Sequence, residues 1–284
     1  MINYYLLTKP GIVFGNLMTV AAGFILGSRG NMNILLFLAT LLGIALIMGS
    51  ACVFNNYIDL NFDKKMKRTK NRALVLGLIS ESQAILFGSI LGIVGILVLL
   101  IETNLLTASL AGLGFFVYVV LYSVWKGRTV YGTAIGSVAG ALPPVIGYCS
   151  AKGQFDAGAC ILFFILVLWQ MPHFFSIALI HYDDYKKAEI PVLPVARSIL
   201  RTKIHMTLYI LLFIPFTMML TLFGYTGNVF LIVTALIGLA WLALCISGFN
   251  TQSDSQWSRQ MFRLSLVVIL VICLILPFDL INKI

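Results

Sequence analysis

The stretch that decides the fold is Leu35–Val53, "LLFLATLLGIALIMGSACV", which contains no charged side chain. A helix needs about 20 such residues to cross the hydrocarbon core of a bilayer. Similar runs recur along the 284 residues, of which 60% are apolar and only 10% charged, with a mean hydropathy of +1.01. A soluble domain is nearer a quarter charged. Because lipid cannot hydrogen-bond an open backbone, the sequence predicts an all-α polytopic membrane protein.

Hydropathy predicts nine spans within a single membrane-embedded domain that covers residues 1–284. Glycines at four-residue spacing, such as Gly11 and Gly15, are expected to let helices approach closely within one bundle. The expected spans are roughly 10–28, 34–58, 83–102, 104–122, 131–149, 157–180, 204–223, 228–249 and 263–281.

The distribution of cations predicts the orientation. If the N-terminus is cytoplasmic, 16 of the 19 Lys and Arg residues fall on the cytoplasmic side, and only Arg29, Lys152 and Lys283 fall on the other. We therefore expect a protein of the bacterial inner (cytoplasmic) membrane with its N-terminus inside and its C-terminus outside. The net charge of +9 does not indicate nucleic acid, because these cations lie at membrane ends, where the bilayer is the partner.

The apolar run Leu35–Val53 is followed directly by Phe54–Arg72, "FNNYIDLNFDKKMKRTKNR". Asn55, Asp59 and Asp63 are four residues apart, so on a helix they share one face. Oxygen ligands at the polar end of a span suit a hard ion such as Mg²⁺, which also takes oxygens from a substrate phosphate. The alternative is that these polar residues only mark the end of a helix at the membrane interface and bind no ligand. The cations that follow can bind phosphate oxygens: Lys67, Arg68, Lys70 and Arg72.

A second stretch of acids followed by bases ends the sixth span, "WQMPHFFSIALIHYDDYKKAEIPVLPVARSILRTK", Trp169–Lys203. The second and sixth spans stand in the same place in two successive four-helix groups, spans 1–4 and 5–8. This order predicts an internal duplication, completed by a ninth helix, whose halves face each other across a central cavity open to the cytoplasm. Asp184, or Asp183, would then approach the first motif, and two acidic clusters can hold one pyrophosphate through bridging metals.

These residues carry a family resemblance. The Asn-x₃-Asp-x₃-Asp pattern of the first motif, followed by "KRTKNRAL", resembles the first aspartate motif of the UbiA-type intramembrane prenyltransferases. Within that superfamily, "LTKP", "WQMPHF" and "DYKKAEIPVLPV" are similar to the protohaem IX farnesyltransferase (haem O synthase) branch. A second Asp-x₃-Asp is absent, because Lys187 stands four residues after Asp183. Asp184 alone matches the second motif, which leaves one or two Mg²⁺ ions open.

The resemblance implies that a farnesyl group passes from farnesyl diphosphate to a vinyl group of haem b, with addition of water, giving haem O. It implies Mg²⁺ held by Asn55, Asp59, Asp63 and Asp184, and an allylic cation stabilised by the face of Tyr122. It also implies a later step by a haem A synthase or a terminal oxidase assembly. The residues expected to bind the diphosphate are Lys67, Arg68, Arg72, Lys126 and Arg128.

Haem would need contacts of its own. His173 follows Pro172 inside a span, where a polar side chain is costly without a partner, so it is a candidate for the iron. A hydrogen-bonded histidine with no ligand is the competing interpretation. The propionates need cations near the surface, for which Lys187 and Arg197 are expected.

Two other functions stay open. A UbiA-type enzyme with an aromatic or quinone-precursor acceptor would have the same metal site. A secondary transporter for an anionic solute could use Asp59 and Asp184 to couple ions, but transporters place such charges near the bilayer middle, whereas here they crowd one face. A CDP-alcohol phosphotransferase would need an Asp-Gly pair, which the sequence lacks.

Overall fold

The computed structural model describes residues 2–281. Within this range the chain forms helices and one isolated bridge between Thr226 and Leu280, and it forms no strand, which confirms the predicted all-α class. Nine segments of these described residues are long and apolar enough to cross a membrane. They are α2 (Pro10–Ser28), α3 (Ile34–Ile58), α5 (Glu81–Glu102), Leu105–Trp125, α8 (Gly132–Lys152), α9 (Ala157–Ile180), α12 (Ile199–Leu222), Asn228–Asn250 and Asp254–Phe278.

Three of these segments are composite. The fourth consists of α6 (Leu105–Phe116), a π-helical turn (Val117–Tyr122) and α7 (Ser123–Trp125). The eighth is α13 (Asn228–Ser247) followed by a 3₁₀ turn, and the ninth is α14 (Asp254–Ile275) followed by another.

The largest differences from the expected spans are two helix starts. Helix α12 begins at Ile199 rather than 204, and α14 begins at Asp254 rather than 263. Ser198 and Ser253 cap these helices, each accepting a hydrogen bond from the backbone three residues on. Charged residues in the first turns lower the hydropathy without breaking the helix. Hydropathy therefore marks the apolar layer, whereas the cap marks where the helix begins.

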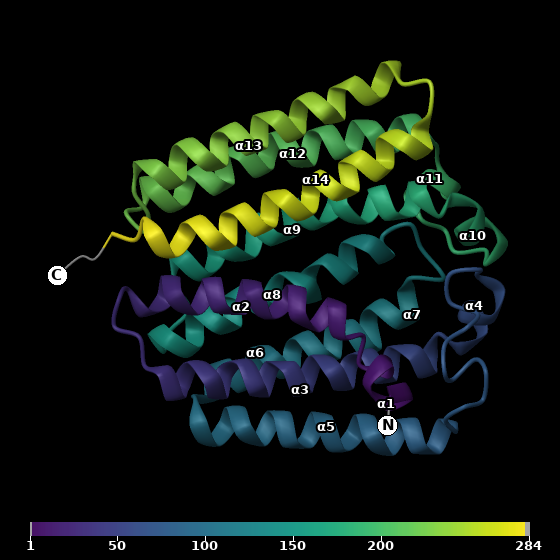
Figure 1. Cartoon of the computed structure of the whole chain (residues 1–284), viewed down its shortest axis with the longest axis horizontal. Helices are drawn as coiled ribbons and strands as arrows, with labels where there is room; N and C mark the ends of the chain where they lie inside the picture. The colour runs from purple at the N-terminus through teal and green to yellow at the C-terminus, as the bar shows by residue number, and fades with distance from the viewer. Residues whose placement is uncertain (1, 282–284) are drawn as a thin grey trace.

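Two four-helix groups are visible in the packing. Helix α3 packs on α2 and α5 as α9 packs on α8 and α12, and α5 contacts α6 as α12 contacts α13. Figure 1 shows the first group in purple and blue and the second in teal and green, with α14 beside α9. Helices α2 and α8 join the two groups.

The contact between α2 and α8 depends on glycine. A Cβ at Gly23 would lie 2.0 Å from the carbonyl oxygen of Pro144, and one at Gly147 would lie 2.1 Å from that of Val20. No side chain fits, so the two backbones approach directly. Gly11 and Gly15 were expected to serve this purpose, but nothing lies within 4 Å of a Cβ at either position. For this pair the expectation is wrong, because both glycines lie on an exposed face of α2.

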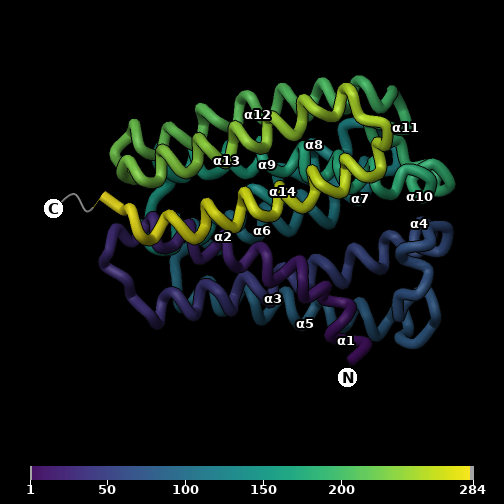
Figure 2. Tube along the Cα trace, turned by 45° about the horizontal axis from the view of Figure 1, so that its top comes forward, coloured from purple at the N-terminus to yellow at the C-terminus, as the bar shows by residue number. Residues whose placement is uncertain are grey.

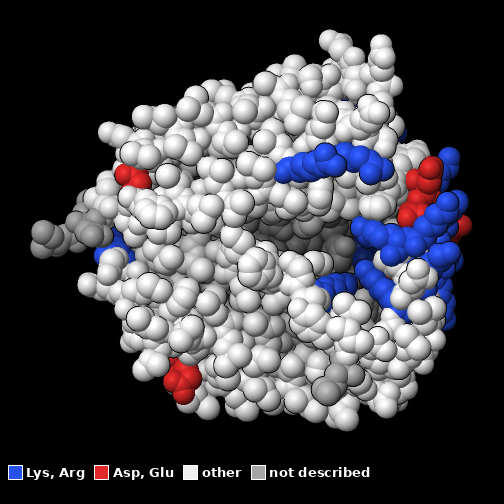
Figure 3. All heavy atoms as spheres, in the orientation of Figure 1, with Lys and Arg blue, Asp and Glu red and all other residues white. Residues whose placement is uncertain are grey.

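Four short helices lie outside the spans: α1 (Ile2–Leu7), α4 (Leu60–Lys65), α10 (Tyr182–Lys187) and α11 (Leu193–Ala196). Helices α4, α10 and α11 gather at one end of the bundle, and both ribbon views agree on this placement (Figures 1 and 2). Most Lys and Arg side chains on the face drawn in Figure 3 cluster at the same end, beside a hollow between the two halves of the molecule. Lys283, one of the three cations expected on the opposite side, lies outside the described residues.

Candidate active site

The two acidic motifs occupy matching corners of the two halves. Helix α3 ends at Ile58, one residue intervenes, and the six-residue α4 follows; α9 ends at Ile180, one residue intervenes, and the six-residue α10 follows. Asp59 is the intervening residue of the first corner, Asp63 lies on α4 and Asp184 on α10. Their exposed fractions are only 7%, 4% and 8%. Buried carboxylates need compensating partners, and each has one.

A polar chain surrounds Asp59. The Asn55 amide Nδ2 donates to Asp59 Oδ2 at 2.9 Å, and Lys9 Nζ donates to Asn55 Oδ1 at 2.6 Å. The Lys126 ammonium forms an ion pair with the other oxygen of Asp59. Burial lowers the pKa of Lys9 to about 8. Three places in the sequence therefore meet around this carboxylate: Lys9, the end of α3 and Lys126.

Asp63 is held by the loop that follows α4. Arg72 Nη1 lies 2.6 Å from Asp63 Oδ2, and the Thr69 hydroxyl donates to the Asp63 carbonyl oxygen at 3.1 Å. The loop thus folds back over α4 and brings its cations to the motif.

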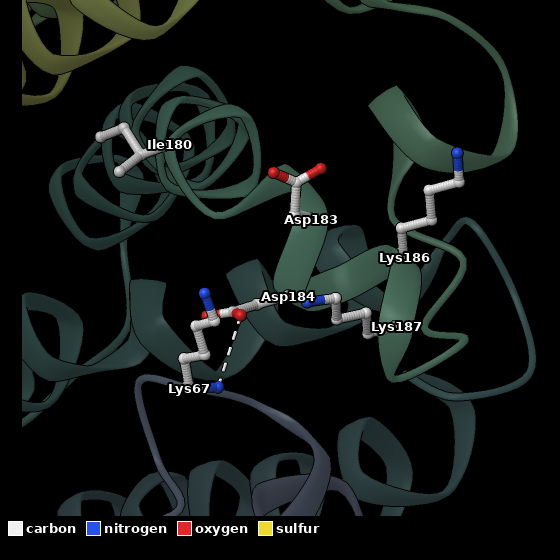
Figure 4. A pocket seen from close by; sticks show the side chains of 6 residues that line it. All are labelled: Lys67, Ile180, Asp183, Asp184, Lys186 and Lys187. Atoms are coloured by element: carbon white, nitrogen blue, oxygen red, sulfur yellow. Dashed lines mark hydrogen bonds between the residues drawn. The ribbon is translucent and has the colours of Figure 1, made fainter.

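The second motif meets the first through this same loop. The backbone N–H of Lys67 donates to Asp184 Oδ1 at 3.3 Å, and His181 Nδ1 lies 4.0 Å from the other oxygen. Burial and the neighbouring Arg68 lower the pKa of His181, so at pH 7 the imidazole is mainly neutral. Figure 4 shows Lys67 approaching Asp184 from a separate chain segment. The pocket at this junction has a volume of about 500 Å³ and is lined by Lys67, Ile180, Asp183, Asp184, Lys186 and Lys187.

The donor set fits a hard divalent ion in its chemistry. Asn55 and the three aspartates offer oxygen ligands, which Mg²⁺ prefers. Among residues 2–281, no three carboxylate, imidazole or thiol groups converge on a single point. Lys126 and Arg72 neutralise the carboxylates of the first motif instead. An ion bound there would therefore compete with these cations for the carboxylate oxygens.

The fourth span contributes aromatic faces through its π-helical turn. Tyr122 stacks on Tyr118 with ring centroids 5.5 Å apart, and Lys126 Nζ lies 5.3 Å from the centroid of Tyr122. Tyr122 therefore stands beside the Lys126–Asp59 ion pair. π-Helical turns are frequent at functional sites.

The remaining predicted cations are spread more widely. Lys187 lines the first pocket together with Lys67. Arg68 lines a second pocket, of about 310 Å³, with Ile177, Ile180, His181, Arg259, Phe262 and Arg263. Arg128 and Arg197 are exposed and line neither pocket. Of the five cations predicted for the diphosphate, one lines each pocket, Lys67 the first and Arg68 the second, and the other three line neither: Arg72, Lys126 and Arg128.

His173 lies between α9 and α14, away from the carboxylates. Its Nδ1 is 2.8 Å from Ser265 Oγ, and its ring lies 4.9 Å from that of Trp169 and 5.0 Å from that of Phe262. The hydrogen bond satisfies one ring nitrogen, which the competing interpretation requires. It also fixes the direction in which the other nitrogen points.

The family model described as "UbiA prenyltransferase family" matches residues 16–267. The chain belongs to this family. It is 57% identical over 283 residues to a protoheme IX farnesyltransferase from Protochlamydia amoebophila (strain UWE25), an alignment that covers 99% of this chain and 100% of the relative. It is 50% identical to a protoheme IX farnesyltransferase from Yersinia pseudotuberculosis serotype O:1b (strain IP 31758), with 98% and 95% of the two chains covered.

Solved UbiA structures share the fold. A digeranylgeranylglyceryl phosphate synthase superposes with a TM-score of 0.81 at 17% identity, covering 99% of this chain and 98% of the other. A UbiA homolog from Archaeoglobus fulgidus bound to GPP and Mg²⁺ superposes with a TM-score of 0.71 at 16% identity, covering 97% and 99%.

Several residues of this UbiA-family site were not predicted. Lys9 was used only for orientation and within the "LTKP" signature, although a cation at the start of a span was a signal for a buried partner. Tyr118 lies four residues before Tyr122, a spacing that places both rings on one helix face. Arg259 and Arg263 were counted only toward orientation, because nothing in the sequence places α14 beside α9.

Proposed function

We propose that this protein transfers the farnesyl group of farnesyl diphosphate to a vinyl group of haem b. The reaction consumes water and yields haem O and pyrophosphate. The 57% identity to a protoheme IX farnesyltransferase over nearly the full length of both chains favours haem over an aromatic or quinone-precursor acceptor. The buried acidic residues at one end of the bundle favour an enzyme over a transporter.

The observation that carries this proposal is the hydrogen bond from Lys67 to Asp184, which joins the two acidic motifs. Asn55, Asp59, Asp63 and Asp184 would hold Mg²⁺, whether one ion or two. Bound Mg²⁺ neutralises the charge that develops on a diphosphate leaving group. The UbiA homolog from Archaeoglobus fulgidus bound to GPP and Mg²⁺ supports this assignment through its shared fold.

The chain's own cations would hold the diphosphate. Lys67 lines the first pocket, while Lys126 and Arg72 form ion pairs with the carboxylates of the first motif. Lys126 and Arg72 can each release a carboxylate oxygen and bind a phosphate oxygen in its place without leaving the site. Arg68 and Arg128 complete the proposed set. Tyr122 would face the allylic cation that forms as the C–O bond weakens, in a cavity of low dielectric.

For haem, we propose that His173 contacts the iron through the ring nitrogen that Ser265 does not engage. Lys187 and Arg197 stay predictions for the propionates, and of the two only Lys187 lines a pocket.

The protein is a multi-pass integral membrane protein. We propose further that it lies in the bacterial inner membrane with the acidic motifs on the cytoplasmic side, which the collection of cations at one end supports. The product would then be available to a haem A synthase or a terminal oxidase assembly.

The proposal is tested with purified protein, farnesyl diphosphate and haem b, with and without Mg²⁺. We expect haem O by mass spectrometry only when Mg²⁺ is present. Asp63→Asn and Asp184→Asn should each lower turnover by at least about 100-fold. Prenylation of a small aromatic acid and not of haem b would contradict the acceptor. Uptake of an anionic solute into vesicles without any product would contradict the enzyme.

A further inference from the structure

The second pocket lies between α9 and α14. Ile177, Ile180 and His181 line it from the α9 side, and Arg259, Phe262 and Arg263 line it from α14. The loop after α4 closes one side with Arg68. Its volume of about 310 Å³ admits part of a larger ligand and not all of it.

The charges of this pocket are of one sign. Three arginines line it and no carboxylate does. None of the ion pairs among residues 2–281 involves these arginines, in contrast to Arg72, which Asp63 neutralises. Unneutralised guanidinium groups around a hollow attract anions, and carboxylates match their paired N–H donors. The first pocket differs, because Asp183 and Asp184 line it together with its lysines.

Two of the arginines are arranged for two anionic groups. Arg259 and Arg263 are four residues apart on α14, so they lie side by side on one helix face. Both are exposed at the pocket rather than buried under other side chains.

Aromatic side chains adjoin the pocket. Phe262 lines it and packs against His173 with ring centroids 5.0 Å apart. His173 lies on α9, and His181 follows the end of that helix eight residues later, a rise of about 12 Å along the helix axis. That distance is on the scale of a porphyrin ring. The interface of α9 and α14 therefore offers arginines at one end and aromatic and imidazole faces further in.

We propose that Arg259 and Arg263 bind the two propionate carboxylates of a porphyrin acceptor and hold its ring along the interface of α9 and α14. The inference rests on the proposed function. It replaces Lys187 and Arg197 as the main anchor of the propionates and places the acceptor beside the donor. The two pockets share Ile180, and the neighbouring residues Lys67 and Arg68 line one each.

The test uses haem b and its dimethyl ester, which keeps the ring and the vinyl groups but lacks the carboxylates. The variants are Arg259→Gln, Arg263→Gln and the double variant. The matched control is Arg201→Gln, an exposed arginine on α12 that lines neither pocket. In wild type, the ester should have a KM at least about tenfold higher than that of haem b, because each carboxylate loses a charge-assisted contact.

In each single variant, the KM for haem b should rise about tenfold while that for farnesyl diphosphate stays within about twofold. The ester should respond to neither substitution. An absorbance titration of haem b without farnesyl diphosphate should show the same loss of affinity.

Equal KM values for haem b and the ester in wild type would overturn the inference without any variant. Substitutions that raise the KM values of haem b and of the ester equally would also overturn it. The phosphate of an anionic lipid presents similar chemistry. If the effect of the substitutions depends on the anionic lipid content of the vesicles and not on the carboxylates of the acceptor, the pocket binds lipid. If wild type makes no haem O, the proposed function fails; if it makes haem O and has equal KM values for haem b and the ester, only this inference fails.

Discussion

The backbone N–H of Lys67 lies 3.3 Å from Oδ1 of Asp184, and this hydrogen bond joins segments 117 residues apart. It connects the loop after α4 to the start of α10, so each half of the molecule contributes one wall of the first pocket. A backbone donor needs no particular side chain, which makes the contact independent of whether Lys67 itself binds phosphate.

Replacing Lys126 with Met should destabilise the protein. The side chains of Lys126 and Asp59 are each only 10% exposed, so the substitution leaves a buried carboxylate without its cation. We expect a loss of about 3 kcal/mol in the free energy of unfolding. Adding Asp59→Asn should restore most of this stability while leaving turnover absent. The measurement is the thermal unfolding midpoint in detergent, and a double variant no more stable than Lys126→Met would contradict the account.

Replacing His173 with Ala should weaken haem b binding roughly tenfold and shift the haem absorption band, because an axial ligand sets the iron's spectrum. Ser265→Ala is the matched control, since it keeps the imidazole and removes only its 2.8 Å partner. This control should bind haem b with a smaller change in affinity. Identical titrations for wild type and His173→Ala would show that this histidine does not bind haem and serves only in packing.

Gly147→Ala should destabilise the bundle far more than Gly11→Ala. The added methyl at Gly147 meets the backbone of Val20, whereas at Gly11 nothing lies within 4 Å. Overpacking of this kind costs roughly 1–3 kcal/mol. Thermal midpoints of the two variants measure the difference. Equal midpoints would show that α2 and α8 separate without penalty.

Cysteine labelling tests the orientation. Single cysteines at positions 68 and 128 should react with an impermeant reagent only from the cytoplasmic side, and those at 29 and 152 only from the opposite side. Of the native cysteines, Cys52, Cys149 and Cys245 are buried and Cys160 and Cys273 are partly buried, so labelling of the unsubstituted chain is measured as the background. Reversed accessibility at both pairs would overturn the proposed topology.

Much of the fold could be predicted from the sequence because membrane spans depend on a local property. A run of apolar residues identifies a helix wherever it packs, and the four-residue spacing of Asn55, Asp59 and Asp63 places them together on any helix. The start of α14 at Asp254 was missed because hydropathy does not detect a capped polar turn.

The partners of the acidic residues could not be predicted in the same way. The pairing of Lys9 with Asn55 and of Lys126 with Asp59 depends on which helices are neighbours, and no local spacing encodes that. Arg68 illustrates the limit most clearly. It follows Lys67 directly, yet the two residues line different pockets.

The proposed mechanism requires that residues from both halves of the molecule bind one ligand. The most direct test is the affinity of a non-hydrolysable farnesyl thiodiphosphate with Mg²⁺ for wild type, Asp63→Asn, Asp184→Asn and the double variant, with the exposed Glu81→Gln as control. Each single variant should bind at least about tenfold more weakly, and the double variant should lose less than the product of the two, as expected for groups that share a ligand. A shared site would be contradicted if Asp184→Asn binds with unchanged affinity. It would also be contradicted if the loss of affinity in the double variant equals the product of the two single losses.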